Sequence, residues 1–283
     1  NLTVDGIDIA ANERAGGLVG DSDGGSVQIS NSLVQNVNIT VNNYAGGVIF
    51  SIRNGSSVTD STVRNVRITG GAELGGISGT SNGNPATVSG CLIENFTSVS
   101  TGERTGGIIG YINNRAYITD TIIRDSSITG YRYIGGVSYT LKDGSVISRV
   151  GVVNVDINAT LNNPSSDHQV GGLVGLVGWG TVNTVRYNYV SNVNINVPGR
   201  MVGGLFGRID TAAHDIGYNY VNETSVSAGT INVGSLVGSR TSGNFTNNFA
   251  INSSALPLVG SGTAGAAGDT NGTPKATGFE GGN

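Results

Sequence analysis

The stretch from Gly16 to Ile39 reads GGLVGDSDGGSVQISNSLVQNVNI, and it recurs in altered form along most of the 283-residue chain. Its first part, a pair of glycines followed by an apolar residue, returns at intervals of 30, 29, 31, 29, 36, 32 and 31 residues. Its second part, from Ser30 to Ile39, follows each glycine pair by about half a period. Because a fixed period overrides local secondary-structure patterns, the sequence is divided into repeats of about 30 residues.

Glycine pairs open the repeats and are predicted to be structural. Paired glycines fit a tight corner where φ is positive, or where two backbones approach too closely for a Cβ. The complete pairs are Gly16 and Gly17, Gly46 and Gly47, Gly75 and Gly76, Gly106 and Gly107, Gly135 and Gly136, Gly171 and Gly172, and Gly203 and Gly204. Gly234 and Ser235 form a weakened further copy.

Aligned repeats contain three columns that are apolar in every copy. The residue after the glycine pair is Leu18, Val48, Ile77, Ile108, Val137, Leu173, Leu205 or Leu236. A second column contains Ile29, Val58, Val88, Ile118, Ile147, Val185, Ile216 and Phe245, and a third contains Val34, Val63, Ile93, Ile123, Val152, Val190, Val221 and Ala250. A composition of 37% hydrophobic residues would fill such columns only rarely by chance, so they are predicted to face one shared core. β-Branched residues dominate them, as expected for strands.

One repeat cannot bury its apolar side alone, so neighbouring repeats must stack. Abundant glycine, 47 residues in all, and the lack of helical stretches leave no helices for crossover connections. The sequence therefore predicts an all-β fold, a right-handed parallel β-helix of about eight coils over residues 1–255, with the hand assigned by analogy. Residues 256–283 are rich in Gly, Ala, Ser and Thr, which predicts a linker or the start of a following domain.

An amide column supports stacking independently of hydrophobicity. It contains Asn36, Asn65, Asn95, Asn154, Asn192 and Asn252, with Asp125 and Glu223 in the remaining positions. Amides repeated at a corner can bond to the amides above and below and satisfy backbone groups. A neighbouring column, Gln35, Arg64, Glu94 and Arg124, alternates in charge and is predicted to face solvent.

The glycine motifs resemble a known repeat. Gly-Gly-Leu-Val-Gly at 16–20 and 171–175, with Gly-Gly-Ile-Ile-Gly at 106–110 and Gly-Gly-Leu-Phe-Gly at 203–207, resembles the GLUG motif. That motif occurs in large bacterial surface and secreted proteins, including the amino-terminal region of streptococcal IgA1-cleaving metalloproteases. The resemblance covers residues 1 to about 255 and implies a β-helix within a secreted or cell-surface, multidomain parent. The zinc peptidase signature of the protease members is missing, since the two histidines, His168 and His214, lie on different repeats.

Composition excludes several classes of function. A net charge of −4 with 12% charged residues argues against nucleic-acid binding, which needs clustered Lys and Arg. The single cysteine, Cys91, can form neither an internal disulfide nor a multi-cysteine metal site, and a small buried side chain is expected there. No apolar run approaches the length of a membrane span. No catalytic residue, cofactor site or metal site is predicted, and the chain is interpreted as non-enzymatic.

Three groups of residues are candidates for a functional site. Carboxylates Asp21 and Asp23 share a turn, and Asp60 and Asp120 share a column two coils apart; solvated turn carboxylates are the default interpretation. The insertion near residues 158–169 is predicted to be a surface loop, in which His168 is a candidate binding residue.

Aromatic residues form the third group. Tyr187 and Tyr218 share one column, while Tyr189, Tyr220 and Phe249 share another, two residues away. Facing outward, the columns would form a strip for stacking on sugars or on a protein partner; facing inward, they would fill the core. The apolar neighbours Leu33, Leu92 and Ile122 favour the inward interpretation for the second column.

Three hypotheses about function follow. The preferred one is a non-enzymatic rod of a large exported bacterial surface protein, acting as an adhesin shaft, a scaffold or a binding surface. The alternatives are a substrate-docking β-helix of an IgA1-protease-like enzyme whose catalytic domain lies elsewhere, and a carbohydrate-active β-helix. A host protein or a glycan is the expected partner, and the unpaired edges at the ends of a β-helix predict end-to-end self-association.

Overall fold

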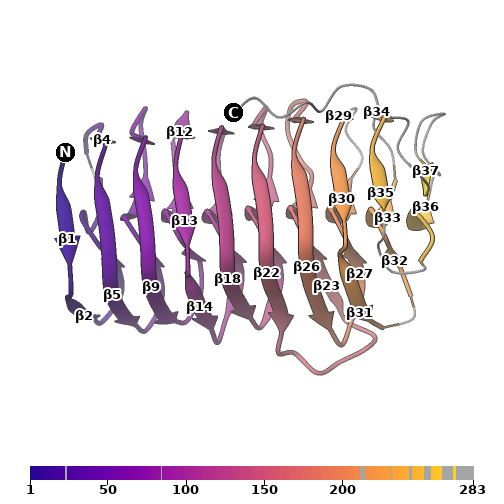
Figure 1. The fold of residues 1–283 in the computed structure, drawn as a ribbon, viewed down its shortest axis with the longest axis horizontal. Coiled ribbons are helices and arrows are strands. Elements are labelled where there is room, and N and C mark those ends of the chain that lie inside the picture. The colour runs from indigo at the N-terminus through magenta and orange to yellow at the C-terminus, as the bar shows by residue number, and fades with distance from the viewer. Residues whose placement is uncertain are drawn as a thin grey trace.

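The computed structural model describes residues 1–22, 24–83, 85–210, 214–229, 231–241, 244–251, 256–262 and 270–271. These residues form an all-β fold without a helix, in which parallel strands stack as a β-solenoid of about eight turns with about 30 residues per turn. Figure 1 shows the coils side by side from β1 (Thr3–Asp5) at the N-terminal end. The predicted all-β solenoid is therefore confirmed.

Four parallel sheets, named A to D here, run along the rod. Sheet A contains thirteen strands, β1, β2 (Asp8–Ala11), β5 (Leu33–Val41), β9 (Thr62–Gly70), β13 (Leu92–Glu94), β14 (Thr97–Ser100), β18 (Ile122–Gly130), β22 (Gly151–Ala159), β26 (Tyr189–Val197), β30 (Tyr220–Asn222), β31 (Ser225–Ala228), β35 (Phe249–Ile251) and β37 (Thr270–Asn271). Sheet B follows it in each coil and contains β3 (Arg14–Gly16), β6 (Tyr44–Gly46), β10 (Leu74–Gly75), β15 (Glu103–Gly106), β19 (Arg132–Gly135), β23 (Asp167–Gly171), β27 (Arg200–Gly203) and β32 (Val233–Gly234).

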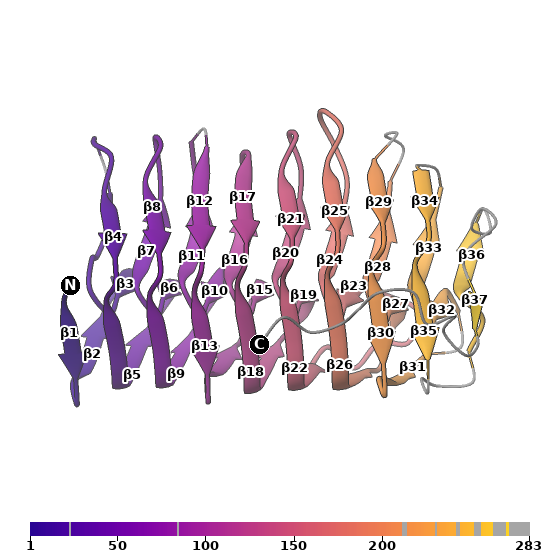
Figure 2. The same ribbon diagram turned by 45° about the horizontal axis from the view of Figure 1, so that its top comes forward.

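Sheets C and D complete each turn (Figure 2). Sheet C contains β7 (Ile49–Ile52), β11 (Ser78–Ser81), β16 (Ile109–Ile112), β20 (Ser138–Leu141), β24 (Val174–Val177), β28 (Phe206–Ile209), β33 (Val237–Arg240) and β36 (Val259–Gly262). Sheet D contains β4 (Gln28–Ser30), β8 (Ser57–Thr59), β12 (Ala86–Ser89), β17 (Ala116–Thr119), β21 (Val146–Ser148), β25 (Thr184–Arg186), β29 (Asp215–Gly217) and β34 (Asn244–Thr246). Because β36 pairs with β33 and β37 pairs with β35, the pairing continues beyond residue 255, where the repeat domain was expected to end.

The predicted core columns are stacked in register. Val34 pairs with Val63, and Ile29 pairs with Val58, each in a neighbouring coil. All three columns are buried, except Leu18 of the first coil, which is only partly buried. Equivalent apolar side chains therefore lie above one another in one continuous core, as predicted.

Left-handed backbone positions turn the chain within each coil. In β5, Asn36 has a φ of 54°, which breaks the alternation of the strand: Gln35 and Asn36 both face outward, and Val37 returns to the core. Asparagine adopts this conformation at lower cost than most residues. The same conformation recurs at the other Asn of the amide column that the structure describes and at Asp125 and Glu223.

Close approach between backbones explains the glycine pairs. A Cβ on Gly46 would lie 2.0 Å from the carbonyl oxygen of Ile49 and 2.7 Å from that of Ile77 in the next coil. A Cβ on Gly47 would lie 2.1 Å from the carbonyl oxygen of Gly76. None of the paired glycines has a positive φ, so the corner between sheets B and C requires glycine for space alone.

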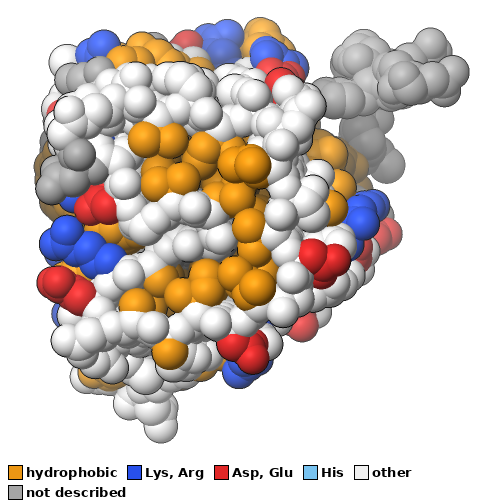
Figure 3. Space-filling model, turned by 90° about the vertical axis from the view of Figure 1, so that its left-hand side faces the viewer, with side chains coloured by type: hydrophobic (Ala, Val, Ile, Leu, Met, Phe, Trp, Pro, Cys, Tyr) orange, Lys and Arg blue, Asp and Glu red, His pale blue; other side chains and the backbone are white. Residues whose placement is uncertain are grey.

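The N-terminal end of the core is open in the described structure. Figure 3 views this end and shows hydrophobic side chains spread across it. Leu2 and Ile7 are exposed, while Val4 and Ile9 are only partly buried. Strands β1 to β4 pair on one side only.

Candidate functional site

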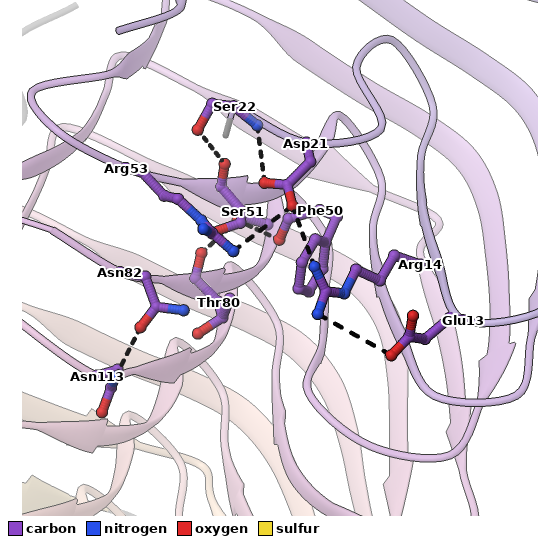
Figure 4. Close-up of polar contacts among 11 residues, drawn as sticks. Glu13, Arg14, Asp21, Ser22, Phe50, Ser51, Arg53, Thr80, Asn82 and Asn113 are labelled. Atoms are coloured by element: carbon purple, nitrogen blue, oxygen red, sulfur yellow. Dashed lines mark hydrogen bonds and ion pairs between the residues drawn. The ribbon is translucent and has the colours of Figure 1, made fainter. Parts of the chain in front are cut away.

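The carboxylate of Asp21 lies between two arginines from successive coils (Figure 4). Its Oδ2 is 3.4 Å from Nη1 of Arg14 and 3.5 Å from Nη2 of Arg53. Its Oδ1 accepts a hydrogen bond of 2.8 Å from the backbone amide of Ser22, whose hydroxyl donates to the carbonyl of Ser51. Asp21 therefore links the first two coils. Asp23, the second member of the expected acidic pair, lies outside the described residues.

Asp120 and Asp60 occupy the corner between sheets D and A. Asp120 accepts two hydrogen bonds from Arg149 of the next coil, from Nε at 2.6 Å and from Nη2 at 2.7 Å. These bonds lower the pKa of the Asp120 carboxyl, which disfavours a role as a general acid at neutral pH. The carboxylate of Asp60 lies against Gly90, where a Cβ would be 2.3 Å from Oδ1. Within the described ranges, no three His, Cys, Asp or Glu side chains are grouped to hold a metal ion.

Glu94 is the centre of the alternating charge column. It is almost buried and binds both Arg64 of the preceding coil and Arg124 of the following coil. The hydrogen bonds from the two guanidinium groups lower the pKa of the Glu94 carboxyl. This acid therefore links three coils. Arg64 and Arg124 are exposed, as predicted for this column, whereas Glu94 between them is buried.

The amide column forms a ladder on the outside of sheet A. Asn65 donates from Nδ2 to Oδ1 of Asn36 at 3.0 Å, and Asn95 donates to Asn65 at 3.1 Å. Asn192 donates to Asn154 at 2.7 Å, and Asn154 donates to Oδ1 of Asp125 at 2.9 Å. The donor belongs to the later coil in every one of these bonds. The ladder is exposed, and Asn252 lies outside the described residues.

A second polar column is buried, and the sequence predicted its burial only at Cys91. Its side chains accept hydrogen bonds from backbone amides of the preceding coil: Ser61 from Ser32, Thr121 from Cys91, Asn188 from Val150, Asn219 from Asn188, and Asn248 from Asn219. The Asn members also donate from Nδ2, Asn188 to Asn219 and Asn219 to Asn248, both at 2.8 Å. Side chains thus supply acceptors for corner amides that the sheets leave unpaired.

Cys91 occupies this buried column. Its Sγ lies 3.4 Å from the carbonyl oxygen of Ser89 and 3.5 Å from that of Val58. Burial raises the pKa of the thiol to about 11. The predicted small buried side chain is confirmed.

Both tyrosine columns face outward. Tyr187 and Tyr218 are exposed and stack on each other with ring centroids 5.3 Å apart and planes 15° apart. Tyr189 and Tyr220 are partly exposed, while Val190 and Val221 beside them enter the core. The inward interpretation of the second column is therefore wrong, because the Leu and Ile residues of that column also lie on the outer surface.

Both histidines are buried, so the prediction of His168 as a binding residue on a surface loop is wrong. In His168, Nδ1 lies 2.9 Å from the carbonyl oxygen of Ser166, and Nε2 lies 2.8 Å from that of Leu161. His168 therefore closes the insertion loop from inside and is not available as a binding residue on its surface. In His214, Nδ1 lies 3.3 Å from the amide nitrogen of Asn183, and burial lowers the pKa of the ring.

Comparisons of the chain with protein-family models, with curated proteins and with solved structures found no match. In the part of the chain that the structure describes, no helix has the length and apolar character needed to cross a membrane.

Proposed function

We propose that this chain is a non-enzymatic, rigid rod of a larger exported bacterial protein, in which it acts as a shaft or scaffold that spaces or presents other parts. The observation that supports this proposal is the uninterrupted parallel pairing along the rod. Sheets B, C and D each contain one strand from eight successive coils, and sheet A runs beside them.

Contacts between coils on the outside of the rod add to this pairing. The amide ladder, the link at Glu94 and the pair of Asp120 with Arg149 each join neighbouring coils. Because each coil contacts only its neighbours, the length of such a rod scales with the number of coils, while its cross-section stays constant. That is the property a shaft needs.

The experiment is a distance measurement between two spin labels. Asn38 and Ser225 are exposed positions of one column of sheet A, six coil steps apart. Their Cα atoms should lie about 29 Å apart at the usual strand spacing. Both would be changed to Cys for labelling, with Cys91→Ser to remove the native thiol, since Ser61 occupies the same column.

A rod predicts one narrow distance. Deleting residues 62–121, which are two whole coils, joins Ser61 to Ile122 in register and should shorten the distance by about 10 Å without broadening it. A broad distribution in the intact chain would overturn the rod. Antibody labelling of a tagged parent protein on intact cells tests the proposed location, and a tag reached only after lysis would exclude it.

A further inference from the structure

Three aromatic side chains along sheet D are exposed and also held in the left-handed backbone conformation. Trp179, in the turn before β25, has a φ of 41° and is 57% exposed. Tyr187 directly follows β25, has a φ of 61° and is 45% exposed. Tyr218 directly follows the paired strand β29, has a φ of 59° and is 42% exposed. In Figure 2, β25 and β29 lie side by side.

Most other coils place residues suited to positive φ at these positions. The corner occupied by Tyr187 and Tyr218 holds Asn31, Asp60, Gly90, Asp120, Arg149 and Asn247 elsewhere, and the turn of Trp179 holds Asn54 or Asp143. Asn, Asp and Gly adopt this conformation at low cost, whereas a bulky aromatic residue is an outlier there. Three aromatic residues therefore carry backbone strain in two neighbouring coils.

Internal packing does not compensate for this strain as it does elsewhere. Tyr133, also at positive φ, packs on buried Tyr139 with ring centroids 4.9 Å apart, and the guanidinium of Arg132 lies 4.5 Å from its ring. Tyr187 and Tyr218 cover only part of each other, and Trp179 is more exposed than either. Because packing offsets little of the strain at these residues, their retention points to a role other than stabilising the fold.

The surface between these aromatic residues is polar and balanced in charge. The outer face of β25 and β29 presents Thr184, Arg186 and Asp215. Arg186 forms an ion pair with Asp215, and its guanidinium lies 5.6 Å from the ring of Tyr218. A protein interface usually has an apolar centre from which charges are depleted. Here charged side chains lie between the aromatic ones.

We propose that this surface, formed by Trp179, Thr184, Arg186, Tyr187, Asp215 and Tyr218, binds a neutral oligosaccharide. A sugar ring combines apolar C–H faces, which suit aromatic side chains, with hydroxyl groups, which suit the guanidinium, carboxylate and threonine hydroxyl. The ion pair balances its own charge, so the surface has no excess charge to attract a polyanion. Because Trp179 precedes β25 and Tyr187 follows it, an extended sugar chain that contacts both would run along this strand, across the rod axis. Tyr218 of the next coil would widen the stacking surface beside Tyr187. This activity is additional to the rod and does not depend on it.

The structure provides substitutions that separate binding from folding. Tyr187→Asn with Tyr218→Asn restores the residue type found at the same corner in Asn31, and Trp179→Asn restores the type found in Asn54. Asparagine relieves the strain, so the melting temperature of these variants should equal or exceed that of the native chain. Tyr131→Asn is the matched control, since Tyr131 is 37% exposed in the turn between sheets A and B.

The test is calorimetry with cellohexaose, maltohexaose and chitohexaose, with a heparin hexasaccharide as the anionic control. Because Trp179 is the only tryptophan, its fluorescence reports binding at this surface directly. We expect at least one neutral hexasaccharide to bind and to change the emission. Its affinity should fall at least tenfold in the double tyrosine variant and in Trp179→Asn, and stay unchanged in Tyr131→Asn.

Several results would overturn the proposal. Binding of no neutral hexasaccharide, binding of the heparin fragment alone, or binding unaffected by the Asn substitutions would each exclude this surface as a neutral-sugar site. A purified glycoprotein that binds equally well after enzymatic removal of its glycans, with none of the free sugars binding, would assign the surface to a protein partner instead. A lower melting temperature in the Asn variants would refute the strain argument.

Discussion

Asn219→Ala should strongly destabilise the solenoid, because the side chain of Asn219 satisfies polar groups in the buried column. Its Oδ1 accepts from the backbone amide of Asn188 at 3.1 Å and from Nδ2 of Asn188 at 2.8 Å. Its own Nδ2 donates to the carbonyl of Val185 at 2.9 Å and to Oδ1 of Asn248 at 2.8 Å. Alanine would remove all four bonds. The backbone amide of Asn188 and one of its two Nδ2 hydrogens would lose their acceptor, while the other Nδ2 hydrogen keeps its bond to the carbonyl of Ile147.

The expected loss is about 2–6 kcal/mol of unfolding free energy, since each buried donor left unsatisfied costs about 1–3 kcal/mol. Guanidinium denaturation followed by circular dichroism measures it, and hydrogen exchange at the Asn188 amide should accelerate in the variant.

Asn65→Gly is the matched control from the exposed ladder. It removes two amide bonds, at 3.0 and 3.1 Å, while glycine keeps the left-handed φ of 51° without strain. Its expected effect is below about 0.5 kcal/mol. A loss for Asn219→Ala as small as that of the control, with unchanged exchange at Asn188, would show that the buried column does not satisfy the corner amides.

Further predictions concern single contacts. Gly46→Ala should cost about 3 kcal/mol because the new methyl group meets backbone oxygen at 2.0 Å, whereas Gly20→Ala, with no atom within 4 Å, should be nearly neutral in the same denaturation assay. Glu94→Gln should cost about 1 kcal/mol at pH 7; because the folded pKa of Glu94 lies below its ordinary 4.5, the difference from the native chain should be present above that pH and vanish as the pH falls through the folded value. Cys91, with a pKa of about 11, should not react with a thiol reagent at pH 8 until the chain is unfolded, and rapid reaction of the native protein would contradict its burial. Since burial lowers the pKa of His214, its contribution to stability should be complete above about pH 6.5 and decline as the pH falls from there toward the folded pKa; a His214→Asn variant with the same pH profile would contradict this.

The repeat allows the fold to be predicted because the same apolar pattern, which is weak in any one copy, recurs at the same positions in every copy. No single stretch such as residues 33–41 specifies a solenoid, but columns that stay apolar through every copy can point only to a shared core. Part of the buried polar column is visible in the sequence, because Ser32, Ser61, Cys91 and Thr121 share a position where every side chain is small, and this pattern predicts the burial of Cys91. The Asn members at positions 188, 219 and 248 were not recognised as belonging to it. The buried polar column and the exposed amide ladder both contain Asn, so the residue types alone do not show which of the two columns is buried.

The direction in which a side chain points, and whether it is buried, were harder to predict than the stacking of the coils. Tyr189 was assigned to the core because its column also contains Leu33 and Ile122, yet apolar residues are common on protein surfaces and an apolar column does not by itself mean a core. His168 lies in an insertion without a counterpart in other coils, so no column indicated that the loop would fold over its ring. The strain at Trp179 and Tyr187 depends on φ values that the sequence does not provide.

The direction of the amide ladder has a consequence for biosynthesis. Each later coil donates to oxygens of the coil before it, as in the bond from Asn65 to Asn36. Translation delivers coils in the same order, so a newly emerging segment finds its template already folded, with the acceptors of the ladder in place. The buried column runs the other way, because the backbone amide of Asn188 donates to Asn219 of the next coil. A new coil can therefore dock as soon as it is made, but its buried corner amides are satisfied only when the following coil has folded.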